Sequence, residues 1–181
     1  MPWTRETLAQ HLDGGANVDW LFFWGHTPKD PAVVDKSCLS QWFPRGFTVD
    51  GVDYPSAEHF MMASKARVFG DAVTEQRIIA AKSPEDAKAL GRQVSPFDAE
   101  TWAREGFAHV VMGNVAKFTQ HPDLKAFLLA TGDKVLVEAA PRDLIWGIGL
   151  AADNPLAKQP RKWRGKNQLG FALMEARAQL K

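Results

Sequence analysis

The segment Tyr54–Arg67, YPSAEHFMMASKAR, predicts the helix around which the rest of the chain is arranged. Pro55 has a backbone φ angle suited to a first helical turn, and Ser56 can cap the free amides at the start of the helix. Neither Gly nor Pro follows until Gly70, which ends the segment. The sequence therefore predicts one uninterrupted helix here.

This helix places two opposite charges on one apolar face. Glu58, Met62 and Lys65 fall at positions i, i+4 and i+7, so they share a face of the helix. Phe60 and Met61 supply further apolar side chains next to it. The spacing is compatible with a carboxylate and an amine inside a pocket. It is equally compatible with an ordinary amphipathic helix whose charges lie at the edge of the apolar face.

The length and composition indicate a single soluble domain. The chain has 181 residues, 45% of them apolar and 24% charged, with a formal net charge of +1. That charge argues against a strong field for nucleic acid or membrane, although a local basic patch is compatible with it. Cys38 is the single cysteine and indicates a reducing compartment. The first residues lack the apolar core of a signal peptide, so we expect a cytoplasmic protein without a membrane span.

The aromatic residues have an unusual distribution. Seven Trp and eleven Phe accompany one Tyr, and several Trp adjoin Gly or charged residues. Such neighbours occur at 23–25, 146–147 and 162–165. Aromatic side chains in this context are typical of a cleft or of stacking on a planar ligand, although all seven Trp are also compatible with purely structural roles.

Periodicity and turn signals predict an α+β fold, a mostly helical single domain with a small antiparallel sheet. An Asp50-Gly51 pair between two apolar triplets is typical of a tight hairpin turn. The strands are expected at 20–24, 47–49, 52–54 and 134–138. The helices are expected at 4–12, 55–67, 71–81, 83–91, 98–118, 122–131 and 167–180. The order of the strands does not follow from these patterns.

Several kinds of chemistry are not expected from these residues. The five His include no H-x-x-x-H pair, and Cys38 has no second cysteine to share a metal with. The chain has no G-x-S-x-G elbow, no Walker A motif and no dinucleotide fingerprint after Gly147-Ile148-Gly149. We therefore expect neither a metal nor another cofactor.

The chemistry that these residues do support is acid/base chemistry by carboxylates that adjoin aromatic residues. Glu58, Glu138 and Asp143 each adjoin an apolar or aromatic run, and burial would raise the pKa of such a group towards the range of an acid/base catalyst. The alternative for Glu138 is a structural carboxylate at a strand end, and for Asp143 a turn-forming residue. Asp143 lies in the Gly- and Pro-rich segment 139–165, and such long irregular segments are usually functional. Arg92 is compatible with phosphate binding or with a solvated surface.

Three longer phrases together resemble the NADAR family, named for NAD and ADP-ribose. The phrases are SQWFPRGFTVDGVDYPSAEHFMMASKA (40–66), VLVEAAPRDLIWGIGL (135–150) and WRGKNQLGFALMEAR (163–177). The Phe22–Gly25 phrase and the Gly91-Arg92 pair extend the resemblance to about residues 19–177. It implies one NADAR-like domain for the whole chain, 1–181.

The resemblance implies an enzyme that hydrolyses the N-glycosidic bond between a ribose C1 and a nitrogen. Two substrate classes go with it: phosphorylated ribosylamino-pyrimidine intermediates of riboflavin synthesis, and ADP-ribose attached to the amino group of guanine in nucleotides or nucleic acid. The segment His26–Cys38 is longer than usual for the family, and Gln41-Trp42 replaces the more usual Asn-Phe. We expect these departures to reshape the rim of the pocket.

Within that resemblance the expected catalytic residues are Glu58, Lys65 and Asp143. Glu58 is expected at the reacting sugar, with Asp143 positioning hydroxyls or sharing the acid/base work. Lys65 either pairs with Glu58 or binds phosphate, or its amine attacks an opened C1. The expected substrate-binding residues are Phe23, Trp24, Arg92, Trp102, Trp146, Gly147, Trp163 and Asn167. A non-catalytic ADP-ribose or nucleotide-binding module is the alternative function, and a purely structural adaptor is a third.

Overall fold

The protein, described by a computed structural model over residues 3–181, is built around a long helix, α5 (Ala99–Gln120). The other helices are α1 (Arg5–Asp13), α2 (Ala57–Val68), α3 (Ala72–Ile79), α4 (Pro84–Gly91), α6 (Pro122–Ala130) and α7 (Gln168–Leu180). The strands are β1 (Trp20–Phe23), β2 (Phe47–Val49), β3 (Val52–Tyr54) and β4 (Val135–Glu138), and two 3₁₀ helices are η1 (Lys36–Leu39) and η2 (Pro160–Lys162). The predicted α+β, mostly helical fold is confirmed.

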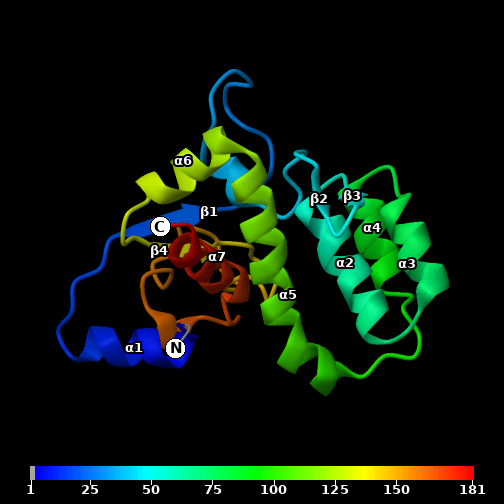
Figure 1. Cartoon of the computed structure of the whole chain (residues 1–181). Coiled ribbons are helices and arrows are strands. Elements are labelled where there is room, and N and C mark those ends of the chain that lie inside the picture. Colours follow the sequence, from blue (N-terminus) through cyan, green and yellow to red (C-terminus); the bar gives the residue numbers. More distant parts are fainter. Residues whose placement is uncertain (1–2) are drawn as a thin grey trace.

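Helix α5 has packed elements on two sides (Figure 1). Helices α2, α3 and α4 form one group, in which each helix contacts the other two, and α2 also packs on α5. Helix α7 packs on α5 and on strand β4, which pairs with β1. The carboxyl end of β4 and the group of helices α2–α4 therefore lie on two sides of α5. This arrangement positions the site described below.

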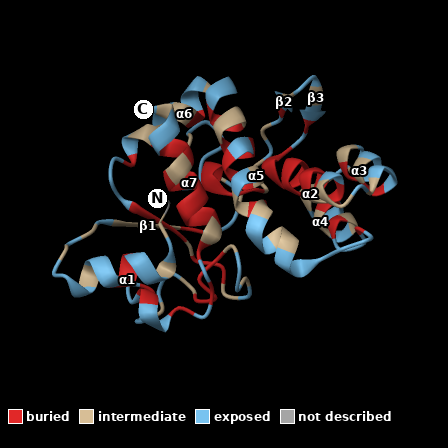
Figure 2. Ribbon diagram, turned by 60° about the horizontal axis from the view of Figure 1, so that its bottom comes forward, coloured by how far each residue is buried: buried red, intermediate tan, exposed pale blue. Residues whose placement is uncertain are grey.

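Helix α2 is buried on almost every face. Ser56 caps it, because its hydroxyl accepts a hydrogen bond from the backbone N–H of His59 at 3.4 Å. Nine of its twelve residues are buried, and most of the helix is red in Figure 2. Glu58 is 4% exposed, so the interpretation that places it at the edge of a surface helix is wrong. Lys65 is half-buried.

The strands form two separate pairs. β2 and β3 make the predicted antiparallel hairpin, whose turn residues Asp50 and Gly51 both have positive φ angles, 51° and 78°. β1 and β4 pair in parallel, with Phe23 opposite Glu138 at their carboxyl ends. This parallel pair, unlike the hairpin, was not predicted, because its strands lie far apart in the sequence. Ligands commonly bind beside the carboxyl ends of parallel strands.

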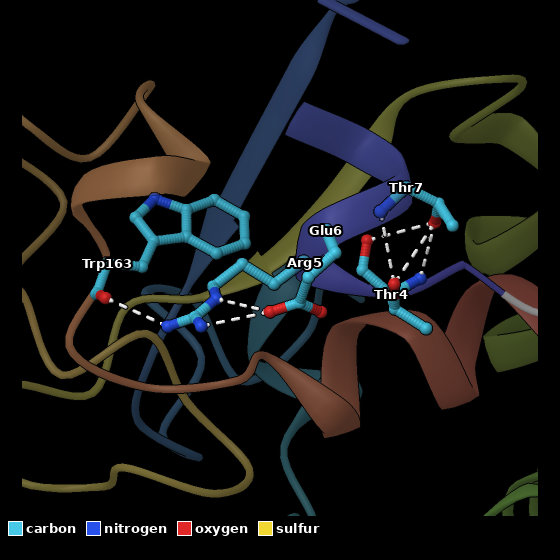
Figure 3. A network of polar contacts seen from close by, with 5 residues as sticks. All are labelled: Thr4, Arg5, Glu6, Thr7 and Trp163. Atoms are coloured by element: carbon cyan, nitrogen blue, oxygen red, sulfur yellow. Dashed lines mark hydrogen bonds and ion pairs between the residues drawn. The ribbon is translucent and has the colours of Figure 1, made fainter. Parts of the chain in front are cut away.

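Helix α1 closes the fold on the side opposite α3. Thr4 and Thr7 form a reciprocal capping box at its start, and Arg5 Nη1 donates to the carbonyl of Trp163 at 3.3 Å (Figure 3). Glu6 pairs with Arg5 in the same network. These contacts attach α1 to the segment that follows η2. Within residues 3–181, no helix is long and apolar enough to cross a membrane.

Candidate active site

A pocket of about 320 Å³ lies between α2, the end of α4 and the carboxyl end of β4. The polar and charged side chains that line it include Gln41, Glu58, Lys65, Lys88, Arg92, Glu138 and Asp143. Its aromatic walls include Trp42, Phe97, Trp102 and Trp146. Three carboxyl groups and three cations thus meet beside flat apolar surfaces, which is an arrangement suited to acid/base chemistry on an aromatic, phosphorylated ligand.

Glu58 enters the pocket from the first turn of α2. Its backbone N–H donates to the carbonyl of Gln41 at 2.9 Å, which fixes the start of the helix against the segment before the hairpin. Burial raises the pKa of its carboxyl group to about 7, with Asp143 adding to the rise and Lys88 opposing it. A group with this pKa exchanges protons near neutral pH.

Glu138 enters from the opposite wall, as the last residue of β4. Its backbone is held on both sides: Asn167 Oδ1 accepts from its N–H at 2.9 Å, and the N–H of Ile148 donates to its carbonyl at 2.9 Å. Its Oε2 is buried and has no hydrogen-bond partner among the described residues. Burial, Asp143 and Glu58 raise the pKa of the Glu138 carboxyl to about 8, and Lys88 opposes the rise.

Asp143 is a turn-forming residue that also lines the pocket. Its Oδ1 accepts hydrogen bonds from the backbone N–H groups of Ile145 at 2.9 Å and Trp146 at 2.7 Å, the pattern of a turn-forming aspartate. The same residue lines the pocket and raises the pKa of both Glu58 and Glu138. The turn thus fixes a negative charge near the two glutamates and places Trp146 in the wall.

The cations occupy separate places around the pocket. Lys65 Nζ donates to the carbonyl of Gly91 at 2.8 Å and lies 4.1 Å from the centre of the Phe97 ring. Burial lowers its pKa. The six ion pairs found within residues 3–181 do not include one between Lys65 and Glu58. Lys88, rather than Lys65, is the largest opposing charge on Glu58.

Two buried polar side chains hold the segment that carries Gln41 and Trp42. Asn114 Nδ2, on α5, donates to Gln41 Oε1 and to the carbonyl of Val110, both at 2.9 Å. Lys117 Nζ donates to the carbonyls of Cys38 at 2.7 Å and Ser40 at 3.1 Å. Helix α5 therefore supports one wall of the pocket through side chains that do not line it.

Three of the aromatic residues expected to bind substrate lie outside the pocket. Phe23 is 1% exposed and belongs to the core, whereas Trp24 is 67% exposed. Trp163 is 3% exposed, and its indole N–H donates to the carbonyl of Ala157 at 2.7 Å. The Gly and charged neighbours of Trp163 suggested a cleft, but its ring packs edge-on against Trp20, and Arg5 binds its backbone carbonyl (Figure 3). Its ring has no free face for a ligand.

Gly147 and Asn167 also lie outside the pocket, where they support its backbone. A Cβ on Gly147 would lie 2.9 Å from the Cβ of Ala140 and 3.0 Å from the carbonyl oxygen of Glu138. Asn167 is buried and contacts two residues of β4: its Oδ1 accepts from the Glu138 N–H, and its Nδ2 donates to the Leu136 carbonyl at 3.0 Å. The remaining expected residues, Arg92, Trp102 and Trp146, line the pocket with the three expected catalytic residues.

Sequence reasoning missed Lys88 and Phe97 as lining residues, whereas Gln41 and Trp42, expected to reshape the rim of the pocket, do line it. Lys88 lies one helical turn before Arg92, so the Gly91-Arg92 pair marked the correct end of α4. Its charge reaches the pocket only because α4 packs on α2. Within residues 3–181, no group of three or more His, Cys, Asp or Glu side chains is arranged to hold a metal ion.

The fold and the pocket together define an α+β domain with a carboxylate-based site among aromatic walls. Comparison with known proteins places it more narrowly, since the NADAR domain profile matches residues 22–181. The chain belongs to the NADAR family.

Two kinds of relative are informative. N-glycosidase R617 of Acanthamoeba polyphaga mimivirus is 42% identical over 163 residues, which cover 87% of this chain and 94% of the relative. N-glycosidase YbiA of Escherichia coli (strain K12) is 37% identical over 134 residues, covering 73% of this chain and 74% of the relative. The NMR structure of the E. coli protein YbiA superimposes with a TM-score of 0.72 at 30% identity, covering 91% of this chain and 86% of that one.

Proposed function

We propose that the protein hydrolyses the N-glycosidic bond between C1 of a phosphorylated ribose, or of ADP-ribose, and the amino nitrogen of a base. The observation that carries the proposal is Glu58, a buried carboxyl group with a pKa of about 7, facing Glu138 and Asp143 in one pocket. The two relatives named N-glycosidases support the same reaction class.

The reaction requires a carboxylate near the sugar. Breaking a ribosyl C–N bond develops positive charge on C1 and the ring oxygen, and a nearby carboxylate stabilises that charge or activates the attacking water. Glu58 is the residue we assign to this role, because it is buried at the start of α2 and lines the pocket. Asp143 is assigned to the sugar hydroxyls.

The walls supply the remaining recognition. Trp102 and Trp146 provide flat apolar surfaces for a base, and Arg92 provides a guanidinium for phosphate. Lys65 is also a phosphate ligand in one route. In the other route its amine, whose pKa is lowered by burial, attacks an opened C1 to form a Schiff base. Borohydride during turnover would trap a reduced adduct at Lys65 only in the second route.

The test is turnover with both substrate classes. Wild-type protein is incubated with ADP-ribosylated guanosine and with a ribosylamino-pyrimidine phosphate, and release of ADP-ribose or ribose phosphate is measured. Glu58→Gln is expected to lower kcat/KM at least about 100-fold, as for other acid/base groups. Glu100→Gln, an exposed glutamate at the start of α5, is the control and is expected to behave as wild type.

Two outcomes would refute the proposal. Near-normal turnover by Glu58→Gln would remove that residue from the chemistry. Binding of ADP-ribose without release of product from either substrate class by the wild-type protein would favour a non-catalytic binding module instead.

A further inference from the structure

The two glutamates in the pocket differ in the charges that surround them. Glu58 lies in the first turn of α2, where the helix dipole contributes partial positive charge. Lys88, Arg92 and a polar contact from the Trp42 side chain all favour its ionised form. Glu58 is therefore the carboxyl group that loses its proton more readily.

Glu138 has the opposite surroundings. It ends a strand rather than starting a helix, and its buried Oε2 has no donor among the described residues. Of the charges that act on it, Asp143 and Glu58 disfavour ionisation, and Lys88 alone favours it. When two carboxyl groups share a dry site, ionisation of one holds the proton on the other. The shared proton therefore resides on Glu138.

The substrate classes of the proposed reaction need such a proton. In each of them the leaving group is an amino nitrogen on an aromatic base, which departs poorly as an anion. We propose that Glu138 is the general acid that protonates this leaving nitrogen, while ionised Glu58 acts at C1 on the other side of the bond. This inference rests on the proposed function and adds a second catalytic residue to it.

The step balances as follows in atoms and charge. The C1–N bond breaks, its electron pair stays on the nitrogen, and the carboxyl proton of Glu138 moves to that nitrogen. Water adds its oxygen to C1, and its proton passes to Glu58. Glu138 is left ionised and Glu58 protonated, and exchange with solvent restores the starting state. No oxidant, reductant or cofactor takes part.

The backbone of Glu138 is held for such a role. Asn167, in the left-handed region at φ 55°, accepts from the Glu138 N–H with its Oδ1 and donates to the Leu136 carbonyl with its Nδ2. The Ile148 N–H fixes the Glu138 carbonyl from the following loop. A residue fixed at both backbone groups places its carboxyl group reproducibly, which general acid catalysis requires.

The experiment compares pH profiles of kcat/KM for wild type and Glu138→Gln under single-turnover conditions with excess enzyme. Because the acid must be protonated, wild-type activity should fall as the pH rises through about 8. Glu138→Gln should be at least about 100-fold slower, and its residual activity should no longer fall above pH 8. Glu138→Asp retains a carboxylic acid and should be slower than wild type with the fall preserved.

A second variant tests whether Lys88, rather than Glu138, causes the fall in activity at high pH. Glu58, Asp143, Lys65, Lys88 and Arg92 lie in the same pocket, and loss of a lysine proton would also give a fall at high pH. Lys88→Met removes the one cation that lowers the pKa of Glu138, so the fall should persist and move to higher pH. Its disappearance in Lys88→Met would assign the fall to Lys88 and overturn the proposal.

The possible results distinguish failure of this inference from failure of the proposed function. Glu138 is not the acid if Glu138→Gln turns over within a few fold of wild type. The same conclusion follows if Glu138→Gln is slow but its activity still falls above pH 8. Loss of the fall in Glu138→Asp as well would lead to the same conclusion. No turnover by the wild-type protein on either substrate class would instead refute the N-glycosidase function itself.

Discussion

Lys117 offers the sharpest test of how α5 supports the pocket. Its side chain is fully buried, and its Nζ donates to the carbonyls of Cys38 and Ser40 just before the pocket residues Gln41 and Trp42. Burial lowers its pKa from 10.5 to about 8, because the charged form loses its hydration. Lys117→Met replaces this group by an apolar side chain of similar length.

The pH dependence of stability follows from these two values. Below pH 8 the lysine is charged in both the folded and the unfolded chain. Between pH 8 and 10.5 the folded protein loses the proton while the unfolded chain keeps it, so the free energy of unfolding rises with pH. At about 1.4 kcal/mol per pH unit, the contribution over this interval reaches about 3 kcal/mol. Met makes no such contribution.

We therefore expect the stability of Lys117→Met relative to wild type to fall by up to about 3 kcal/mol between pH 8 and pH 10.5. At pH 7 the difference should be smaller, because relief of the buried charge offsets the loss of two hydrogen bonds, each worth about 1 to 3 kcal/mol. Cys38, whose pKa is raised to about 12 by burial, is present in both chains, so its ionisation largely cancels in the comparison.

Urea unfolding at pH 7, 8, 9 and 10, followed by the fluorescence of the seven Trp, measures this difference. Lys82→Met, an exposed lysine in the turn before α4, serves as the matched control. Its stability relative to wild type should not change over the interval. A difference between Lys117→Met and wild type that stays constant from pH 7 to pH 10 would refute the reasoning.

Two further predictions concern the pocket itself. In the wild type, kcat/KM should rise with pH through about 7 as Glu58 ionises. Lys88→Met should move this rise to a higher pH, because the variant loses the largest charge that favours ionised Glu58. A rise at unchanged pH would contradict this assignment. Asn114→Leu should destabilise the protein by about 1 to 3 kcal/mol, since Gln41 Oε1 loses its buried donor. The variant should also lower kcat more than it raises KM, because the Gln41 carbonyl binds the Glu58 N–H. A kcat equal to that of wild type, measured with the same substrate, would show that Gln41 does not position Glu58.

Local signals were sufficient to predict the helices and the hairpin. The predicted bounds differ from the observed ones by at most two residues, because caps such as Ser56 and Asp98 act on the amides of the next turn. The hairpin likewise depends on the turn residues Asp50 and Gly51. The parallel pairing of β1 with β4 was not predictable from such signals, since the contacts that select it come from α7 and the distant loop.

The site residues also differ in whether local signals could predict them. Glu58 and Asp143 could be predicted as pocket residues because each adjoins an apolar or aromatic run in the sequence. Lys88 could not, because its charge reaches Glu58 only through the packing of α4 on α2. Trp163 misled the prediction for a related reason. Its sequence neighbours are polar, but in the fold its ring packs on Trp20 and its indole N–H donates to the carbonyl of Ala157.

The segment after β4 shows how residues outside the pocket support the backbone of a pocket residue. The N–H of Gly165 donates to the carbonyl of Ile148 at 2.9 Å, and the N–H of Asn167 donates to the carbonyl of Gly147 at 3.0 Å. These bonds connect residues 147–148, inside the loop, with its end at residues 165–167, and Ile148 and Asn167 in turn bind the backbone of Glu138. A Cβ on Gly165 would overlap the Gly147 carbonyl, so a side chain there would displace this support. Residues 147–167 of the loop are therefore a packed scaffold that fixes the backbone of Glu138, whereas Asp143 and Trp146 of the same loop line the pocket.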